Sequence, residues 1–286
     1  MSEPLVSVKM ITYNHRPYIS QAIEGVVQQK TEFSFELVIG EDCSTDGTRE
    51  IVFEYQKRYP DLIRVITSEQ NVGMKQNGRR TAEACRGKYL AFCEGDDFWH
   101  DPEKLQKQID FLEKNPDCGL VFSDFDVFHT QSKKLIKNFL KYKKRAIPRN
   151  PRISDIVTGD TGILTCTVVV RRDLYERVKN EDPFLHLSDH FLMGDTQMWA
   201  EIATLADLHF IPESLARYNL LDESVSRSKD RIKRTRFAVS NAELLIYLCN
   251  KYNLPPHIRK IHELNWATYS LRLAFYSRSA SLAEKV

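Results

Sequence analysis

The sequence predicts an α/β fold with a mainly parallel sheet flanked by helices and a helical C-terminal extension. Two observations lead to this prediction. Short apolar runs rich in β-branched residues alternate with helical patterns over the first 125 residues, which is typical of βαβ units. From residue 229 onward the pattern is helical, with a break at Pro255-Pro256. The chain of 286 residues is long enough for one large domain or two small ones with a core.

The N-terminal elements alternate regularly. Five strands are expected, at residues 6–11, 35–39, 62–66, 89–93 and 120–122. Four helices are expected between them, after Pro17, around residues 51–59, over residues 75–86, and from Asp101-Pro102 to the residue before Pro116. Proline begins or ends three of these helices and glycine ends the other, which agrees with the usual positions of these residues at helix termini.

The second half of the chain is less regular. Residues 131–152 contain nine Lys or Arg residues and no acidic residue, which predicts an exposed loop or a helix with a solvated face. A strand is expected at residues 163–170, a helix near residues 195–206, and a short strand at residues 208–211.

The composition excludes several classes of protein. The 41 basic and 39 acidic residues leave a net charge of +2, which is too balanced for a nucleic-acid-binding protein. No apolar run approaches the roughly 18–20 residues that span a bilayer, and the N-terminus lacks the regions of a secretory signal. The six cysteines are scattered without a CxxC pair, which favours reduced thiols over disulfides or a zinc site. We therefore expect a cytoplasmic protein.

Polar side chains gather where the predicted strands end. The clusters are Thr12-Tyr13-Asn14, Glu41-Asp42 and Glu94-Gly95-Asp96-Asp97. Parallel strands present their carboxyl ends at one edge of a sheet, where ligands of such sheets bind. Because like charges repel, two acidic clusters in one crevice need a cation or hydrogen-bond donors between them. A Mg²⁺ or Mn²⁺ ion that holds a diphosphate meets this need.

These residues also have structural alternatives. Asp96 and Asp97 are typical turn formers, although Asp101 is already available to cap the next helix. Tyr13 could stack on a base or pack on the first helix. The motifs of other phosphate sites and of hydrolases, GxGxxG, GxxxxGK[ST], HExxH and GxSxG, are absent from the sequence. A phosphate would therefore be held mainly by a metal ion and side chains.

Four sequence blocks in this order resemble the family-2 glycosyltransferases: SVKMITYNH, VIGEDCSTDGT, NVGMKQN and GKYLAFCEGDDFWHDPEKL. The resemblance covers residues 5–125 well and residues 155–228 more thinly. It implies the A-type fold of that family, which is Rossmann-like and has a mainly parallel sheet. It also implies a nucleotide-diphosphate sugar as donor and direct displacement with inversion.

The resemblance assigns roles to the residues at the strand ends. Residues that match Thr12, Tyr13 and Asp42 line the nucleoside pocket of the family, and those that match Asp96 and Asp97 form its DXD-type motif on ribose and metal. Glu94 stands where many members have the first Asp. Asp97 is therefore expected to hold Mn²⁺ or Mg²⁺ chiefly, with Asp96 and Glu94 as further metal candidates. The predicted nucleotide site also includes the polar residues Asn14, Glu41, Asn71 and Arg217.

The catalytic base of the family lies just before a helix in the second half, and residues 193–199 are the matching stretch. We predict that Asp195 accepts the proton of the acceptor hydroxyl, with Asp189 in reserve and His190 as a weaker candidate. Asp195 could instead be a helix N-cap, a common position for aspartate. A helix N-terminus also favours the ionised carboxylate that a base requires.

Two further segments have more than one interpretation. Arg217-Tyr218-Asn219, followed by Ser224-Val225-Ser226, resembles the family's loop that closes over the donor diphosphate, but Arg217 could equally be a surface charge. The Lys/Arg-rich stretch 133–152 could attract an anionic acceptor or an anionic membrane surface, or it is simply solvated.

The sequence thus predicts a glycosyltransferase that moves a sugar from a nucleotide-diphosphate sugar, a UDP-sugar, to a saccharide or lipid-linked acceptor in polysaccharide or glycolipid synthesis. Residues 1–125 would bind the donor, residues 126–228 the acceptor, and residues 229–286 would form the helical extension. A nucleotidyltransferase and a non-catalytic nucleotide-sugar-binding protein are the alternatives. No nucleic-acid partner is expected, peripheral membrane contact stays open, and the sequence predicts no oligomeric state.

Overall fold

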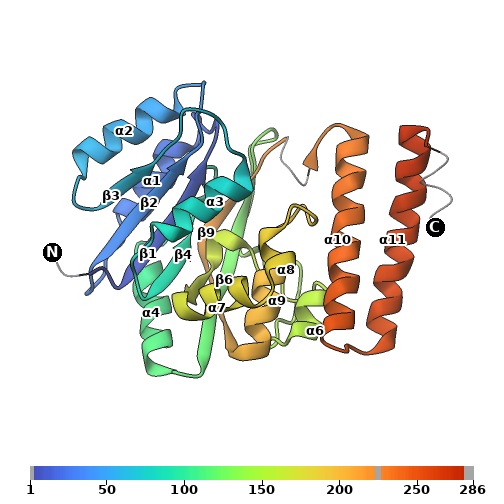
Figure 1. The fold of residues 1–286 in the computed structure, drawn as a ribbon. Helices are drawn as coiled ribbons and strands as arrows, with labels where there is room; N and C mark the ends of the chain where they lie inside the picture. The colour runs from blue at the N-terminus through green and yellow to red at the C-terminus, as the bar shows by residue number, and fades with distance from the viewer. Residues whose placement is uncertain (1–2, 223–226, 280–286) are drawn as a thin grey trace.

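The computed structural model describes residues 3–222 and 227–279, in which nine strands form one sheet with helices on both faces (Figure 1). Residues 224–226 of the predicted diphosphate loop and the end of the predicted C-terminal extension lie outside the described residues. The strands are β1 (Val6–Thr12), β2 (Phe35–Glu41), β3 (Ile63–Ile66), β4 (Tyr89–Phe92), β5 (Phe98–Trp99), β6 (Cys118–His129), β7 (Lys134–Ile136), β8 (Val169–Arg171) and β9 (Asp207–Leu220).

The helices alternate with these strands in the first half and gather in the second. They are α1 (Ile19–Val27), α2 (Thr48–Arg58), α3 (Met74–Glu83), α4 (Lys104–Lys114), α5 (Phe139–Tyr142), α6 (Ile153–Val157), α7 (Arg172–Glu181), α8 (Pro183–Leu187), α9 (Thr196–Leu205), α10 (Arg231–Lys251) and α11 (Pro256–Ser277). Apolar side chains at helical spacing bury one face of α1, where Ile19, Ile23 and Val26 are all inaccessible to solvent.

The predicted α/β fold is confirmed, and its sheet is mixed. The order is β3-β2-β1-β4-β8-β6-β9-β5, with β7 paired to β6. The first four strands are parallel because α1, α2 and α3 each supply the long crossover that parallel neighbours need. β5 begins six residues after β4 ends, which is too short for a crossover, and it pairs antiparallel with β9. β8 is antiparallel to both β4 and β6.

Two strands of the second half differ from the sequence prediction. Residues 163–170 do not form one strand: Thr165–Thr167 is a 3₁₀ helix, and only Val169–Arg171 pairs in the sheet. The Thr167 amide and hydroxyl both donate to the Leu164 carbonyl and close this turn. The strand predicted at residues 208–211 extends to Leu220, past a register shift opposite Ser123 and Asp124 that accommodates Pro212.

The core has two layers, one on each face of the sheet. Alternating residues of β2 enter different layers: Leu37 and Ile39 pack with α1 and α4, whereas Val38 packs on the side of α7, α9 and α10. A sheet that is buried on both faces leaves its strand ends as the positions where polar loops meet solvent.

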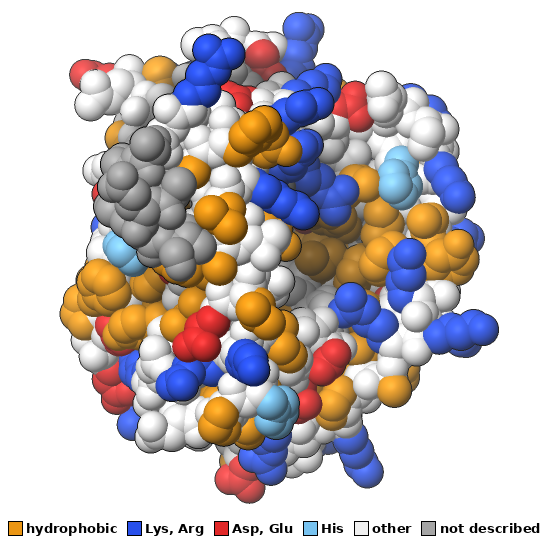
Figure 2. Space-filling model, turned by 90° about the vertical axis from the view of Figure 1, so that its right-hand side faces the viewer, with side chains coloured by type: hydrophobic (Ala, Val, Ile, Leu, Met, Phe, Trp, Pro, Cys, Tyr) orange, Lys and Arg blue, Asp and Glu red, His pale blue; other side chains and the backbone are white. Residues whose placement is uncertain are grey.

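The predicted C-terminal helices are confirmed as α10 and α11, which lie side by side at the edge of the molecule away from β3 (Figure 1). Leu244, Leu245 and Leu248 of α10 join the core layer formed by α9. On the side of these two helices the surface has a hollow with largely hydrophobic walls and Lys and Arg side chains along its rim (Figure 2). None of the helices in the described part of the chain has the length and hydrophobicity needed to cross a bilayer.

Candidate active site

The three polar clusters follow neighbouring strands at one edge of the sheet. β1 lies between β2 and β4, and the loops that follow those strands are both tied to its end. The Asp42 amide donates to the Thr12 carbonyl at 3.1 Å, and the Gly95 amide donates to the Ile11 carbonyl at 3.0 Å. A Cβ atom at Gly95 would lie 2.6 Å from Thr12 Oγ1, so a glycine is needed for this close approach.

The first cluster shapes the rim beside β1. Asn14 adopts a left-handed conformation with φ 54°, its amide donates to Ser44 Oγ, and its Oδ1 accepts from the Thr45 amide at 2.9 Å. Thr12 is buried, whereas Tyr13 is 44% exposed. The Tyr13 ring is therefore accessible for stacking, while Asn14 holds the two loops together.

Glu41 is fully buried and its carboxylate is occupied by protein donors. Its Oε2 accepts from Arg49 Nε at 2.6 Å and its Oε1 from the Ser44 amide at 2.6 Å. Burial alone would raise the pKa of Glu41, but these hydrogen bonds outweigh it and the pKa is lowered. Glu41 thus stays ionised and orders the loop that follows β2.

Asp42 connects this loop to the segment before α3. Its two carboxylate oxygens accept from the Val72 amide at 2.9 Å and the Gly73 amide at 3.0 Å. Asn71 Oδ1 accepts from the same Gly73 amide at 3.0 Å. Asp42 is almost completely buried and follows β2, whereas Asp97 follows β4. β1 lies between the two strands that these aspartates follow.

The acidic turn, residues Glu94-Gly95-Asp96-Asp97, follows β4 and brings three carboxylates together. The Asp97 amide donates to the Glu94 carbonyl at 3.0 Å and closes the turn. Burial raises the pKa of Asp97 well above its ordinary value, and the negative charges of Asp96 and Glu94 raise it further. The Asn219 amide, 3.0 Å from Asp97 Oδ1, opposes this shift only in part.

Glu94, like Asp97, has a pKa that is raised by burial and by neighbouring negative charges. Its Oε2 is buried and has no hydrogen-bond partner within the described part of the chain. Burial and the charge of Asp96 raise the pKa of Glu94 from 4.5 to about 7, with a smaller contribution from Asp195 and a small opposing one from Lys9. An orphaned acceptor inside a repelling acidic group is the environment that a bound cation would relieve.

The donor set fits a divalent cation shared with a ligand. No three His, Cys, Asp or Glu side chains within residues 3–222 and 227–279 are arranged as a complete metal cage. Mg²⁺ usually takes one or two protein carboxylates and completes its coordination with substrate phosphates and water. The acidic turn offers such carboxylates at Asp96, Asp97 and Glu94.

Asp195 lies near the acidic turn, since its charge contributes to the raised pKa of Glu94. It is the N-cap of α9: its Oδ1 accepts from the Thr196 amide at 2.7 Å, and its Oδ2 accepts from Thr165 Oγ1 at 3.1 Å. The N-cap interpretation is therefore correct, and it does not exclude the predicted role as base. Asp189 is 94% exposed and lies 3.6 Å from Lys75 Nζ.

His190 packs against aromatic neighbours. Its ring centroid is 5.2 Å from that of Phe184 in a tilted arrangement and 4.6 Å from that of Phe191 in an edge-on one. Among the three candidates for the base, Asp195 alone is electrostatically linked to Glu94 in the described residues.

β9 donates two hydrogen bonds to the acidic turn, a contact that the sequence does not predict. The Asn219 amide donates to Asp97 Oδ1, and Asn219 Nδ2 donates to the Asp96 carbonyl. The guanidinium of Arg217 contacts two rings, 4.9 Å from the centroid of Phe98 and 5.2 Å from that of Phe128. Burial lowers the pKa of Arg217, and the charges of nearby aspartates, Asp97 included, oppose this effect.

The sequence also does not predict that Lys104 is buried. It is fully buried, burial lowers its pKa to about 7, and its Nζ lies 4.1 Å from the centroid of the Trp99 ring. The Nζ donates to Gln108 Oε1 at 2.6 Å. No sequence signal distinguishes this lysine from the exposed charges of an amphipathic helix.

A comparison with protein families shows the family of this chain. The model described as "Glycosyl transferase family 2" matches residues 7–178, more than half of the chain. The chain belongs to glycosyl transferase family 2. The resemblance seen in the sequence blocks is thereby confirmed.

Curated relatives of this family-2 chain differ in how much they share with it. It is 36% identical over 169 residues to an uncharacterised protein of Mycobacterium tuberculosis, and it spans about half the length of that relative (53% of this chain, 49% of the relative). It is 27% identical over 248 residues to the putative teichuronic acid biosynthesis glycosyltransferase TuaG of Bacillus subtilis, covering 86% and 91% of the two chains. The putative glycosyltransferase EpsE of Bacillus subtilis is 28% identical over 258 residues, covering 89% and 85%.

Solved structures share the fold of this family-2 chain. TarS 1-349 of S. aureus in complex with UDP-GlcNAc aligns with a TM-score of 0.64 at 18% identity, covering 98% of this chain and 76% of that one. The mannosyltransferase PcManGT of Pyrobaculum calidifontis, in complex with GDP-Man and Mn²⁺, aligns with a TM-score of 0.61 at 16% identity, covering 100% and 76%.

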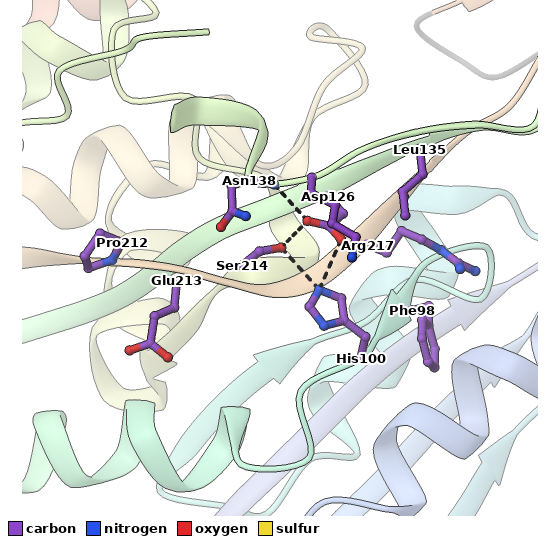
Figure 3. A pocket seen from close by; sticks show the side chains of 10 residues that line it. Phe98, His100, Asp126, Leu135, Asn138, Pro212, Glu213, Ser214 and Arg217 are labelled. Atoms are coloured by element: carbon purple, nitrogen blue, oxygen red, sulfur yellow. Dashed lines mark hydrogen bonds and ion pairs between the residues drawn. The ribbon is translucent and has the colours of Figure 1, made fainter. Parts of the chain in front are cut away.

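A cavity of about 530 Å³ lies between β5, β6, β7 and β9, and Arg217 of this family-2 chain lines it (Figure 3). Ser214 Oγ donates to Asp126 Oδ1 at 2.6 Å, while His100 Nε2 lies 3.2 Å from Ser214 Oγ and 3.8 Å from Asp126 Oδ2. In a hydrolase triad the aspartate and the serine bind opposite ring nitrogens. Here both neighbours face Nε2, so these three residues do not form a triad.

Proposed function

We propose that this protein transfers a sugar from a UDP-sugar to an acceptor hydroxyl, with a divalent cation at the acidic turn and inversion at the anomeric carbon. The observation that carries the proposal is the acidic turn itself, where Glu94 and Asp97 have raised pKa values and Glu94 Oε2 has no partner in the described residues. The complexes of related folds with UDP-GlcNAc and with GDP-Man and Mn²⁺ support it.

Asp97 and Asp96 would hold Mn²⁺ or Mg²⁺, with Glu94 as an additional ligand. When bound, the cation neutralises the negative charge that develops on the departing diphosphate. Arg217, which is held beside the acidic turn by Phe98 and Phe128, would face the same diphosphate. The cation would lie at the acidic turn, and Asp42 would line the nucleoside pocket without sharing it.

The nucleoside would bind between the first two clusters. The exposed ring of Tyr13 would stack on the base, next to Thr12 and Asn14. Asp42 and Asn71 would form the other wall, since they order residues 71–73 through amide hydrogen bonds. Glu41 would act by shaping this wall, because its oxygens are already occupied.

Asp195 would accept the proton of the acceptor hydroxyl. As that oxygen forms its bond to the anomeric carbon, the bond from this carbon to the diphosphate oxygen breaks, and UDP leaves with the electron pair. The position of Asp195 at the N-terminus of α9 favours its ionised form. The contribution of its charge to the raised pKa of Glu94 supports this assignment.

The wider assignments follow from this arrangement. Residues 1–125 would form the donor half and residues 126–228 the acceptor half of one domain, with the boundary inside β6, and residues 229–286 the helical extension. The acceptor would be a saccharide or lipid-linked sugar in polysaccharide or glycolipid synthesis at the cytoplasmic face of a membrane. The exposed residues Lys141, Lys143, Lys144 and Arg145 would contribute to peripheral contact with anionic lipids.

The substitution Asp195→Asn tests the proposed reaction. UDP release from a panel of UDP-sugars is measured with Mn²⁺ and with water or neutral glycosides as acceptors. Loss of the base should lower turnover about 100-fold or more while the affinity for the donor is retained. The matched variant Asp189→Asn removes the reserve carboxylate. Normal turnover in D195N together with a loss in D189N would transfer the role of base to Asp189.

The same assay separates the alternatives. A non-catalytic binding protein would bind the donor and release no UDP from it. A nucleotidyltransferase would instead release pyrophosphate when it is given a nucleoside triphosphate and a sugar phosphate. Release of UDP by the wild-type protein, with no pyrophosphate from the second mixture, would support sugar transfer.

A further inference from the structure

A second cavity, which we call the helical cavity, lies between the segment 156–163 and helices α9, α10 and α11. Its volume is about 350 Å³, within the range of small-molecule sites. Among its lining residues Asn265 is exposed, whereas Trp199 and His262 are more than nine-tenths buried. The cavity therefore runs from the surface into the core.

Two residues that line the helical cavity have buried nitrogen atoms without hydrogen-bond partners in the described part of the chain. They are Nε1 of Trp199 and Nε2 of His262. Buried polar atoms in native proteins are nearly always paired, so two orphans at one cavity indicate a missing polar partner. Both residues are held firmly, Trp199 by an edge-on contact with Phe92 at 5.4 Å and His262 by a hydrogen bond to the Val157 backbone.

The two nitrogen atoms are complementary in hydrogen bonding. Trp199 Nε1–H can only donate. Burial lowers the pKa of His262, which keeps the imidazole neutral at pH 7. In the tautomer that carries its proton on Nδ1, Nε2 of His262, which has no partner in the described residues, has a free lone pair and accepts. A hydroxyl group both donates and accepts, and so it can satisfy such a pair.

The lining of the helical cavity is uncharged. It contains the amides of Asn241 and Asn265 and the hydroxyls of Thr196 and Tyr269, and no Asp, Glu, Lys or Arg lies among its described lining residues. The cavity in Figure 3, in contrast, is lined by charged side chains that include Asp126 and Arg217. A phosphate or carboxylate would lose its hydration in the helical cavity without gaining a counter-charge, whereas a neutral polyol would not.

The helical cavity is adjacent to the proposed base. Thr196 lines it, and the Thr196 amide donates to Asp195 Oδ1 at 2.7 Å. Ile163 also lines it, two residues before Thr165, whose hydroxyl donates to Asp195 Oδ2. A sugar bound there would therefore lie beside the carboxylate that takes the acceptor proton.

We propose that the helical cavity binds an uncharged, hydroxyl-rich sugar residue of the acceptor, recognised by Trp199 Nε1–H as donor and His262 Nε2 as acceptor. The assignment to the acceptor rests on the proposed function; the binding of a neutral sugar does not. α10 and α11 then do more than extend the fold, because they supply the half of the specificity pocket that contains Asn241 and His262.

Binding is tested with protein that contains 5-fluorotryptophan, whose ¹⁹F spectrum has one signal for each of Trp99, Trp199 and Trp266. Single Trp→Phe variants assign the signals. The probes are the methyl glycosides of glucose, galactose, mannose and N-acetylglucosamine, titrated to tens of millimolar to detect weak binding. We expect at least one glycoside to shift the Trp199 signal saturably. If all three signals stay in place with all four glycosides, the proposal is overturned.

Paired variants of His262 test the recognition. Asn places its amide near the position of Nδ1 and lacks an atom at Nε2, whereas Gln reaches the Nε2 position. We expect His262→Asn to weaken the glycoside about tenfold, and His262→Gln to stay within about threefold of the wild type. Trp266→Phe on the same helix, whose indole donates to Glu243, is the matched control and should titrate like the wild type. Equal affinities for H262N, H262Q and the wild type would overturn the proposal.

The same labelled protein separates this inference from the proposed function. UDP is added with Mn²⁺ in a separate titration, and its binding is measured by calorimetry. If UDP fails to bind while the Trp199 signal still responds to a glycoside, the proposed function fails and the sugar site stands. If UDP binds and no glycoside moves the Trp199 signal, the sugar site fails and the proposed function stands.

Discussion

Glu94 has an environment that a carboxylate tolerates poorly without a cation. Its Oε2 lacks a partner in the described residues, and burial together with Asp96 raises its pKa to about 7. Between pH 4.5 and 7 the folded state therefore binds more protons at Glu94 than the unfolded state does. By linkage, this group lowers the stability of the metal-free protein as pH rises through that range.

The substitution Glu94→Gln should remove this pH-dependent loss. In the presence of a chelator, the free energy of unfolding at pH 8 should exceed that of the wild type by about 2–3 kcal/mol, with a much smaller difference at pH 4.5. Urea unfolding at the two pH values measures it. Glu54→Gln, at an exposed position on α2, is the control and should leave the pH dependence unchanged. If the free energy of unfolding differs between E94Q and the wild type by the same amount at pH 8 and at pH 4.5, the raised pKa of Glu94 is contradicted.

At the scale of single residues, the sequence predicts those site positions that lie directly after a strand. Asp42, Asp96 and Asp97 follow the ends of parallel strands, which the apolar runs predict. The prediction failed where the partner is distant: Asn219, which braces Asp97, lies 122 residues away in the sequence. It also gave Glu41 a ligand role without knowing that Arg49 occupies its carboxylate.

At the scale of elements, the acidic turn depends on its contact with the end of β1. A Cβ atom at Gly95 would lie 2.6 Å from Thr12 Oγ1 and 3.0 Å from His15 Nδ1. We expect Gly95→Ala to shift the turn and to weaken UDP binding in Mn²⁺ about tenfold or more, with a loss of stability of about 1–3 kcal/mol. Calorimetry and urea unfolding measure the two effects. Gly73→Ala is not a suitable control because φ at Gly73 is +86°.

Gly194→Ala is the control for the variant at Gly95, since a Cβ atom at Gly194 would have no atom within 4 Å from any described residue other than its chain neighbours. It should bind UDP like the wild type. Unchanged UDP affinity in Gly95→Ala would show that the turn does not need this close approach, and the proposed geometry of the donor site would then be wrong.

Element prediction succeeded where one periodicity dominates and failed where local hydrogen bonds or pairing partners override it. The first four strands and α1 were found from apolar spacing alone. Residues 163–170 are rich in β-branched residues, which predicts one strand, yet Thr167 closes a 3₁₀ turn onto Leu164. The full length of β9 was missed because Pro212 and polar residues interrupt its pattern, while pairing with β6 sustains the strand.

For the whole molecule, an ionic cluster joins α8 and α9 to the C-terminal helices. Lys251 Nζ at the end of α10 lies 2.6 Å from Asp182 Oδ2 and contacts Glu201 of α9, which also accepts from Tyr252 and pairs with His186. Burial would raise the pKa of Glu201, but these partners lower it. The stabilisation is therefore present above the ordinary glutamate pKa and is lost as pH falls through the lowered pKa.

The substitution Lys251→Met should lower the free energy of unfolding by about 2–3 kcal/mol at pH 7, because it leaves Glu201 buried with fewer partners. The difference from the wild type should shrink at acid pH as Glu201 becomes protonated. Lys233→Met, at an exposed position on the same helix, should change stability by less than about 0.5 kcal/mol. Equal urea midpoints for K251M and the wild type would show that the cluster does not anchor α10.

The central claim is that a nucleotide diphosphate binds at the acidic turn through a divalent cation. Calorimetric titration of UDP into the wild type and into Asp97→Asn, in Mn²⁺ and in chelator, tests it most directly; Asp110→Asn at an exposed position on α4 is the control. We predict binding to the wild type and D110N in Mn²⁺ only, and an affinity at least about 100-fold lower for D97N. Equal UDP affinity in chelator, or in D97N, would contradict the account.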